Sequence, residues 1–367
     1  MEPLEGKDVD RMTPEEVRFR VEYRQGLQRR EIEDYLRRLA FDYEKRREEL
    51  WKRDYSSPAA YVKSVEPNRR RLAQSLGEFD DEGADFAPEW RPFFEDGKIL
   101  ARRLSVEAAP GLPARAVLAL PKGAAGPAPL VICQHGIASS PERVFGFDDP
   151  EGIYKGYGRA LAERGFAVLA PSNTTGHAPR NRLERIARLL GGTLWGLEIF
   201  RTRRTLDFLE TVDEIDMKRV GMYGISLGGA YTSFLTPLES RIKAAVICAW
   251  FNDRLNKMII EDPRWSCFLP SDEEYVFWPR WLWEFADGDL ASLICPRPLL
   301  VECGKGDGIA WWPHVVAEFE RAREHWAKMD LAERSEIDLH DGGHEIRGVK
   351  SFAFLHKWLV ERGAEIF

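Results

Sequence analysis

One serine stands among glycines at positions 224–229, where the sequence is GISLGG. The run RVGMY directly precedes this segment, and leucine and small residues follow the serine. This order predicts a buried strand that ends at the first glycine and a helix that begins after the serine. In a Gly-x-Ser-x-Gly turn between a strand and a helix, the strained backbone exposes the serine hydroxyl, and the glycines avoid clashes. Ser226 is therefore the candidate nucleophile, and a glycine-rich turn with an incidental serine is the structural alternative.

A serine hydroxyl becomes a good nucleophile only when a base removes its proton and an acid orients that base. Candidates for both follow later predicted strands. Asp307 lies in GKGDG, after the apolar run 298–303, and His344 lies in HDGGHE, after the run 335–339. Loops at the carboxyl ends of parallel strands share one edge of a sheet, so both side chains can reach the serine. The predicted triad is Ser226, Asp307 and His344.

Three nearby residues compete for the roles of base and acid. His340 directly continues a strand, which favours local packing over catalysis. Glu302 and Asp341 are rival acids, but Glu302 lies within a strand and Asp341 lies beside the histidine loop, which disfavours both. The spacing from His340 to His344 also permits a metal site, but two such ligands share a face only on a helix, and Gly342–Gly343 disfavours a helix. We expect no metal and no cofactor.

The negative charge that develops on an attacked carbonyl oxygen requires N–H donors. The N–H of Leu227, directly after the serine, is one predicted donor. The second should come from the loop QHGI at 134–137, where we favour the Ile137 N–H, with Gly136 as the alternative. His135 in the same loop is interpreted as a structural residue.

These candidate residues need a scaffold of strands and helices, and the sequence shows that alternation from about residue 97. Strands that are apolar throughout and separated by helices predict an α/β fold, with a mostly parallel central sheet covered by helices on both faces. The predicted strands are 99–106, 114–120, 129–134, 166–170, 220–224, 242–249, 298–303 and 335–339, and the predicted helices are 154–164, 182–212, 227–235, 314–328 and 348–362.

Residues 1–90 have a different character, and we interpret them as a helical extension before a catalytic domain at 91–367. Apolar residues at helical spacing predict helices over 31–51 and 59–76. Their apolar faces need burial, either on the catalytic body or against another subunit. Assembly of a homo-oligomer through this extension is therefore one expectation.

A cap-like segment is predicted at about 250–295, between two strands of the sheet. Seven of the twelve tryptophans fall within residues 250–312. A cap above the carboxyl ends of the strands would form the wall of the serine's pocket, and aromatic rings make such a wall rigid and largely apolar. Trp250 and Trp311 are the predicted substrate contacts. For most of these tryptophans, a purely structural place in the core of the cap is the alternative.

Charge and composition exclude several function classes. The 367 residues carry a formal net charge of −7, which gives no general attraction to nucleic acid. The N-terminus is densely charged without the apolar core of a signal peptide, and no run reaches the ~18 apolar residues that span a bilayer. If Met1 is the natural start, we expect a cytoplasmic protein without a membrane partner. The five scattered cysteines do not indicate a disulfide framework.

With these motifs in place, the chain resembles the α/β-hydrolases, nearest the dienelactone-hydrolase-like and acetyl xylan esterase-like group. The resemblance covers about residues 97–367 and rests on QHGI, GISLGG, GKGD, DGGHE and the segment 213–221. It implies that the triad and oxyanion-hole residues named above have those roles. Dienelactone hydrolases proper use a cysteine nucleophile, whereas this chain has Ser226.

Together these observations predict a serine carboxylesterase that forms an acyl-enzyme with a small-molecule ester, with short acyl or aryl groups preferred. A prolyl-oligopeptidase-like peptidase shares such a catalytic domain, but 90 mostly helical residues are too few for a propeller. A non-catalytic scaffold on the same fold is a third interpretation, and the intact serine, acid and histidine argue against it.

Overall fold

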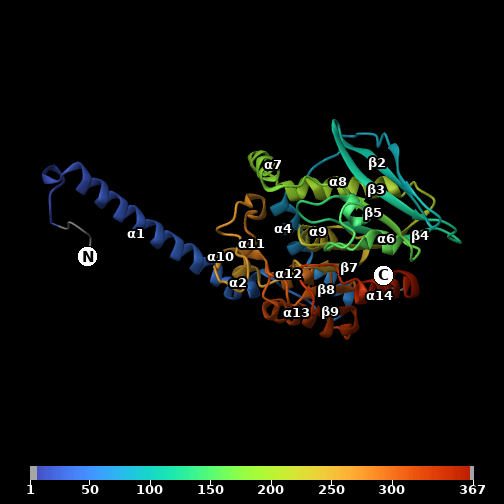
Figure 1. The fold of residues 1–367 in the computed structure, drawn as a ribbon. Coiled ribbons are helices and arrows are strands. Elements are labelled where there is room, and N and C mark those ends of the chain that lie inside the picture. The colour runs from blue at the N-terminus through green and yellow to red at the C-terminus, as the bar shows by residue number, and fades with distance from the viewer. Residues whose placement is uncertain (1–5, 364–367) are drawn as a thin grey trace.

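The computed structural model describes residues 6–363, which form a nine-stranded sheet, helices on both of its faces and a helical N-terminal extension (Figure 1). The first three strand pairs in spatial order are antiparallel, and all later pairs are parallel. In that order the strands are β1 (Glu89–Glu95), β2 (Ile99–Ala109), β3 (Leu112–Pro121), β5 (Ala167–Pro171), β4 (Ala128–Gln134), β6 (Ile215–Ile225), β7 (Ile242–Cys248), β8 (Leu299–Gly304) and β9 (Ser335–His340).

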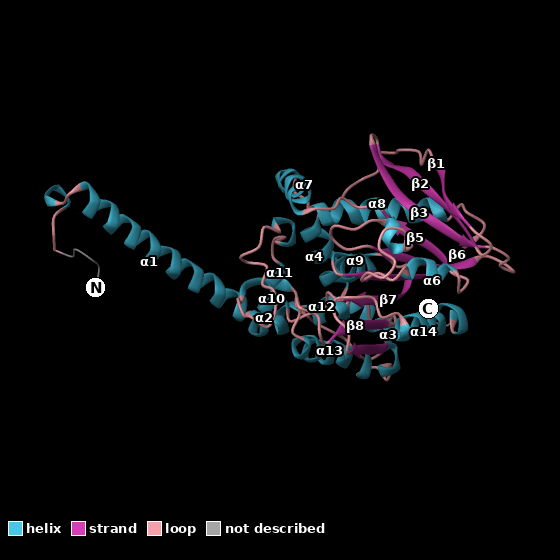
Figure 2. Cartoon of the chain, in the orientation of Figure 1, coloured by secondary structure: helices cyan, strands magenta, loops and turns pink. Residues whose placement is uncertain are grey.

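Helices cover both faces of this sheet (Figure 2). One face packs against α5 (Pro141–Val144), α6 (Tyr157–Ala162) and α14 (Val349–His356), which continues into a π-helical turn, Lys357–Glu361. The other face packs against α8 (Leu194–Leu209), α9 (Leu227–Leu238), α12 (Asp287–Ser292) and α13 (Trp312–Ala327). The remaining helices of the body are α7 (His177–Leu189), α10 (Arg254–Ile259) and α11 (Trp281–Glu284).

The central strands are apolar throughout because both of their faces are buried. In β4, Leu130 and Ile132 contribute to one core cluster, whereas Val131 and Cys133 contribute to the other. Alternate side chains of a strand point to opposite faces, so a strand covered on both sides needs an unbroken apolar run. The predicted α/β architecture, a mostly parallel sheet with helices on both faces, is confirmed.

The N-terminal extension is helical, as predicted, but its two parts differ. A capping box of Thr13 and Glu16 begins α1 (Pro14–Phe41), which projects from the body and buries none of its residues (Figure 1). By contrast, α2 (Tyr43–Leu50), α3 (Pro58–Ser64) and α4 (Glu66–Leu76) pack on the body. Tyr61, Leu72 and Leu76 belong to the same core cluster as α8 and α9, so this second part belongs to the main core.

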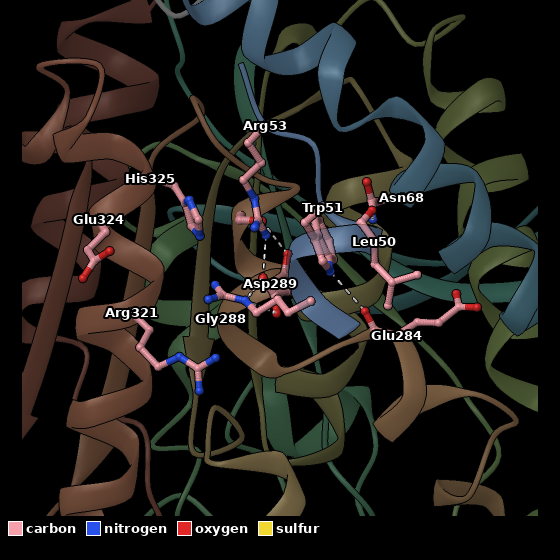
Figure 3. Close-up of polar contacts among 12 residues, drawn as sticks. Leu50, Trp51, Arg53, Asn68, Glu284, Gly288, Asp289, Arg321, Glu324 and His325 are labelled. Atoms are coloured by element: carbon pink, nitrogen blue, oxygen red, sulfur yellow. Dashed lines mark hydrogen bonds and ion pairs between the residues drawn. The ribbon is translucent and has the colours of Figure 1, made fainter. Parts of the chain in front are cut away.

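A buried carboxylate attaches the second part of the extension to α12 (Figure 3). Asp289 has a fully buried side chain and accepts hydrogen bonds from the Arg53 guanidinium, at 2.5 Å, and from the Tyr43 hydroxyl. Nearby, the indole N–H of Trp51 donates to the carbonyl of Glu284 at 3.2 Å. Because these groups come from segments more than 200 residues apart, the contacts fix the extension on the body.

Three predictions about the elements are wrong. The edge strand β1 was not predicted, because EWRPFFE is mostly exposed and contains a proline, which hides the usual strand pattern. The predicted helix 182–212 is two helices, since Gly191 adopts a φ of 86° after the end of α7. The first long helix begins at Pro14, well before residue 31.

The segment 250–295, predicted to be cap-like, connects β7 to β8, and its last helix, α12, packs on a face of the sheet. It contains α10, a 3-10 turn at Glu274–Val276, α11 and α12. Among residues 6–363, no helix is both long enough and apolar enough to cross a membrane.

Candidate active site

Ser226 occupies a strained turn between β6 and α9. Its φ of 58° and ψ of −122° lie in a region that residues other than glycine rarely adopt. The flanking glycines make the turn possible, because a Cβ on Gly224 would lie 2.1 Å from the Gly228 carbonyl oxygen. A Cβ on Gly228 would lie 2.0 Å from the carbonyl oxygen of Gln134. The backbone is therefore too crowded for side chains at these two positions, as a nucleophile elbow requires.

Asp307 and His344 come from separate loops and meet beside this turn. The Nδ1 atom of His344 lies 2.9 Å from Oδ2 of Asp307. The aspartate is 3% exposed, and its other oxygen accepts a hydrogen bond of 2.9 Å from the Ile309 N–H. A hydrogen bond from the Gly306 N–H to the Gly342 carbonyl, 2.9 Å long, joins the two loops. Backbone groups of the two loops thus hold Asp307 and His344 in place.

The rival histidine and one rival acid have other partners. Nδ1 of the buried His340 accepts a hydrogen bond of 3.1 Å from the Gly342 N–H, within its own loop. The side chain of Asp341 is 91% exposed and pairs with Lys305 at 2.9 Å, a contact that lowers the pKa of this aspartate. Neither residue lines the cavity that contains the serine.

Glu302 is a buried structural carboxylate. It accepts hydrogen bonds from the Tyr223 hydroxyl at 2.8 Å, from the Arg347 N–H at 2.9 Å and from the Ser351 hydroxyl. Arg347 follows closely after His344, so this carboxylate anchors the chain on which the histidine is carried. The sequence could identify Glu302 only as an acid within a strand, because its donors lie far along the chain.

The loop after β4 approaches the serine closely. A Cβ on Gly136 would lie 3.2 Å from the Cβ of Ser226. The Gly136 N–H, the alternative oxyanion donor, is already bonded to the Tyr154 hydroxyl at 2.8 Å. The Ile137 N–H has no acceptor within residues 6–363, and Leu227, at the first position of α9, has no intrahelical acceptor for its N–H. These two groups are the available donors.

His135 in the same loop is structural, as predicted. Its Nε2 accepts a hydrogen bond from the Asn173 N–H at 3.3 Å, so Nδ1 carries the proton and donates to the Gly136 carbonyl at 2.8 Å. Burial lowers the pKa of His135 to about 4, which keeps the ring neutral near pH 7. This neutral ring holds the loop that carries Ile137.

A cavity of about 250 Å³ joins the candidate residues. Ser226, Leu227, Ile137 and His344 line it, together with Trp250 of the cap-like segment.

The second predicted aromatic contact lies elsewhere. Trp311 is absent from the cavity wall, because its ring packs on Trp265 at 6.2 Å and on His314 at 4.6 Å between ring centres. Ile309 and Ala310 of the same loop line the cavity instead. The prediction that Trp311 contacts substrate is therefore not supported by its position.

Several polar residues of the cavity wall were missed by the sequence analysis, among them Lys257 and Asn252. Lys257 on α10 donates from Nζ to the carbonyl and hydroxyl oxygens of Ser266, at 2.6 and 2.5 Å, and to the Ile309 carbonyl at 2.8 Å. Asn252 follows β7 closely, and its position after a strand of the sheet was the one available signal. No local pattern indicates Lys257, because only the packing of α10 brings it to the loop of Asp307.

Comparisons with known proteins relate this chain to hydrolases. Residues 114–267 match the dienelactone hydrolase family. A Bacillus subtilis protein named "Putative hydrolase YtaP" is 25% identical over 252 residues, which cover 65% of this chain and 81% of that protein.

Solved structures show the same fold at low sequence identity. Acetyl xylan esterase 1 from Thermoanaerobacterium sp. JW/SL YS485 is 20% identical, with a TM-score of 0.51 over 87% of this chain and 98% of that chain. A glucuronoyl esterase from Solibacter usitatus is 13% identical, with a TM-score of 0.60 over 85% and 94% of the two chains.

The family match includes Ser226 and the loop of Ile137, and it ends before Asp307 and His344. The solved structures extend the likeness in fold beyond the matched segment, over 85% and 87% of this chain. These findings support a hydrolase with the α/β-hydrolase fold, in which residues 114–267 match the dienelactone hydrolase family.

Proposed function

We propose that this chain is a serine carboxylesterase with Ser226 as nucleophile, His344 as base and Asp307 as orienting acid. One arrangement carries the proposal: a serine at a strained elbow shares a cavity with a histidine whose Nδ1 lies 2.9 Å from a buried aspartate. The solved structures named above are esterases by their titles, which supports an ester as the bond that is cleaved.

The reaction follows from these contacts. With its Nδ1–H donated to Asp307, the His344 ring has Nε2 free to take the proton from the Ser226 hydroxyl. The serine oxygen attacks the ester carbonyl, and the N–H groups of Ile137 and Leu227 stabilise the resulting oxyanion. Nε2 then protonates the leaving alcohol as the ester C–O bond breaks, which leaves an acyl-enzyme. Water, deprotonated by His344, attacks the acyl carbonyl and releases the acid.

The size of the cavity supports a short acyl or an aryl group as the preferred substrate part. Its volume is about 250 Å³, just below the usual range for small-molecule sites, ~300–1,000 Å³. Trp250, Phe268 and Tyr275 give it aromatic walls. We propose Trp250 as a substrate contact.

The test is a panel of acetyl, butyryl, octanoyl and palmitoyl 4-nitrophenyl esters beside aminoacyl anilides. We expect kcat/KM to be highest for acetyl or butyryl esters, since this ratio reports differential binding of the transition state. Ser226→Ala should keep the fold and lower turnover by several orders of magnitude, because the covalent route is lost. Ser240→Ala, at an exposed serine after α9, is the matched control.

Three outcomes would contradict this proposal. Near-normal turnover by Ser226→Ala would show that Ser226 is not the nucleophile. Faster cleavage of the anilides than of the esters would favour the peptidase alternative. A maximum at octanoyl or palmitoyl esters would exclude the short-acyl pocket.

A further inference from the structure

The cavity wall includes a buried amide side chain, that of Asn252, which the proposed mechanism does not use. Asn252 lines the cavity together with Ser226 and His344, and it is only 4% exposed. Among residues 6–363, the hydrogen bond of Asn252 is made by its backbone N–H, and its side-chain amide has no protein partner. Solvent still reaches the side-chain amide. Because the residue is so deeply buried and lines the cavity, that solvent is the solvent of the cavity.

The backbone around this asparagine is fixed on both sides. Its N–H donates to Oδ2 of Asp287 at 3.0 Å, and Asp287 forms a buried ion pair with Arg254 at 2.6 Å. The next residue, Asp253, caps α10 by accepting a hydrogen bond of 3.1 Å from the Asn256 N–H. A group held in this way can bind a ligand without the entropic cost of ordering a loop.

Most other polar groups of this wall already have partners in the protein. The buried indole N–H of Trp250 has none among the described residues, but it can only donate. The Lys257 ammonium donates to Ser266 and to the Ile309 carbonyl, and Glu273 accepts from the Tyr275 hydroxyl. By contrast, the Asn252 amide offers an acceptor oxygen and donor N–H groups that no protein atom uses. A neutral group that both donates and accepts, such as a hydroxyl, is its natural complement.

We propose that the Asn252 amide determines substrate specificity by hydrogen-bonding a hydroxyl group on the acyl or the alcohol part of the ester. This inference rests on the proposed esterase function of the same cavity. An ester without the hydroxyl would cover the amide and leave it without a partner, and a buried polar group without a partner is unfavourable. The site should therefore favour hydroxylated esters over plain alkyl esters of the same size.

Two matched pairs of esters test this proposal. For the acyl part, 4-nitrophenyl 3-hydroxybutyrate is compared with 4-nitrophenyl butyrate, and for the alcohol part, 2-hydroxyethyl butyrate is compared with propyl butyrate by proton release. We expect the wild-type protein to prefer the hydroxylated member of one pair, which identifies the part that Asn252 contacts. Asn252→Leu should lower kcat/KM for that ester at least ~10-fold and change kcat/KM for its plain partner less than about threefold.

Asn256→Leu is the matched control, because this asparagine lies on α10, pairs with Asp253 and does not line the cavity. Asn256→Leu should change kcat/KM for both esters of a pair by the same factor. If Asn252→Leu does not fold, Asn252→Ala removes the amide without added bulk and carries the same expectation.

Equal losses on both members of each pair would mean a structural role for Asn252 and would overturn the inference. The absence of a hydroxyl preference in wild type would also overturn it, while turnover of the plain esters would leave the proposed function intact. If the wild type cleaves none of the esters, the proposed function fails and this inference fails with it.

Discussion

At the scale of single residues, the candidate site depends on which of two histidines meets the buried aspartate. His344 contacts Asp307, whereas His340 accepts a hydrogen bond from its own loop. The two histidines are four positions apart, but Gly342 and Gly343 turn the chain between them, so they face different surroundings.

Substitutions at these positions should therefore have unequal effects. Asp307→Asn and His344→Ala should each lower kcat on an acetyl ester at least ~10³-fold, because they orient and supply the base. His340→Ala and Asp341→Asn, the matched controls, should lower kcat far less. Thermal unfolding of each variant separates lost catalysis from lost stability. An inactive His340→Ala beside an active His344→Ala would show that the loop assignment is wrong.

Lys257 carries a charge in the wall of the same cavity. Burial, together with the nearby Arg254, lowers the pKa of Lys257 from 10.5 to about 8, although Asp307 and Glu273 oppose this change. As a cation it can donate to all three of its acceptors, two on Ser266 and one on Ile309.

The lowered pKa predicts a pH dependence of stability. Between about pH 8 and 10.5 the unfolded chain binds the Lys257 proton more fully than the folded chain does. The free energy of unfolding should therefore rise with pH in that window through this group, by at most ~1.4 kcal/mol per pH unit. Lys257→Met lacks the proton and should lack this contribution. Denaturant unfolding of both proteins at pH 7.5, 8.5 and 9.5 measures this contribution. If the difference in unfolding free energy between the two proteins stays the same at all three pH values, the prediction is wrong.

At the scale of elements, α2 and the segment after it are attached to α12 through Asp289. Burial acts to raise the pKa of Asp289, but Arg53 and Arg47 outweigh it and lower the pKa. Arg47 and Arg53 lie at 3.1 and 2.5 Å from the Asp289 carboxylate. The ionised aspartate thus neutralises the charge of two guanidinium groups, and Figure 3 shows its contact with Arg53.

Removing this carboxylate should weaken the whole fold. Asp289→Ala leaves the buried Arg53 unpaired, and breaking a buried ion pair typically costs about 3–5 kcal/mol of stability. Asp42→Ala is the control, because Asp42 pairs with Lys45 at the surface, and its effect should be much smaller. Chemical denaturation of the full chain measures both. Equal effects of the two substitutions would show that the buried contact does not hold the extension.

At the scale of the whole molecule, the two parts of the extension call for different experiments. Phe19, Ile32, Tyr35, Leu36 and Phe41 of α1 are each more than half exposed. In contrast, Trp51 and the apolar residues of α3 and α4 lie in the main core. Any association through the extension is therefore proposed for α1, where apolar side chains remain uncovered.

Two truncations test this division. Removal of residues 1–41 should leave a folded body with its esterase activity and a lower subunit count in light scattering, because only uncovered apolar surface is lost. Removal of residues 1–77 should cause aggregation, since it opens the core around Leu72 and Leu76. An unchanged subunit count in the shorter truncation would contradict association through α1. A stable, monodisperse protein in the longer truncation would contradict the place of α4 in the core.

Much of this molecule could be predicted from local sequence patterns. Apolar runs of four to eight residues identified the central strands, because burial on both faces excludes polar residues from them. The glycines around Ser226 identified the elbow, because crowding at that turn is a property of adjacent residues. The positions of Asp307 and His344 after strands were equally local, although their catalytic roles stay predictions.

Only the tertiary structure decided which groups meet across the chain. The Tyr154 hydroxyl accepts a hydrogen bond from the Gly136 N–H, and Trp311 packs on Trp265. Asn252 and Lys257 line the cavity that contains Ser226. The packing of helices and loops on the sheet determines these contacts, and it depends on residues tens to hundreds of positions away. The same reason explains why α1 projects while α4 is buried. Both have helical patterns, but only α4 has a complementary surface on the body to cover its apolar face.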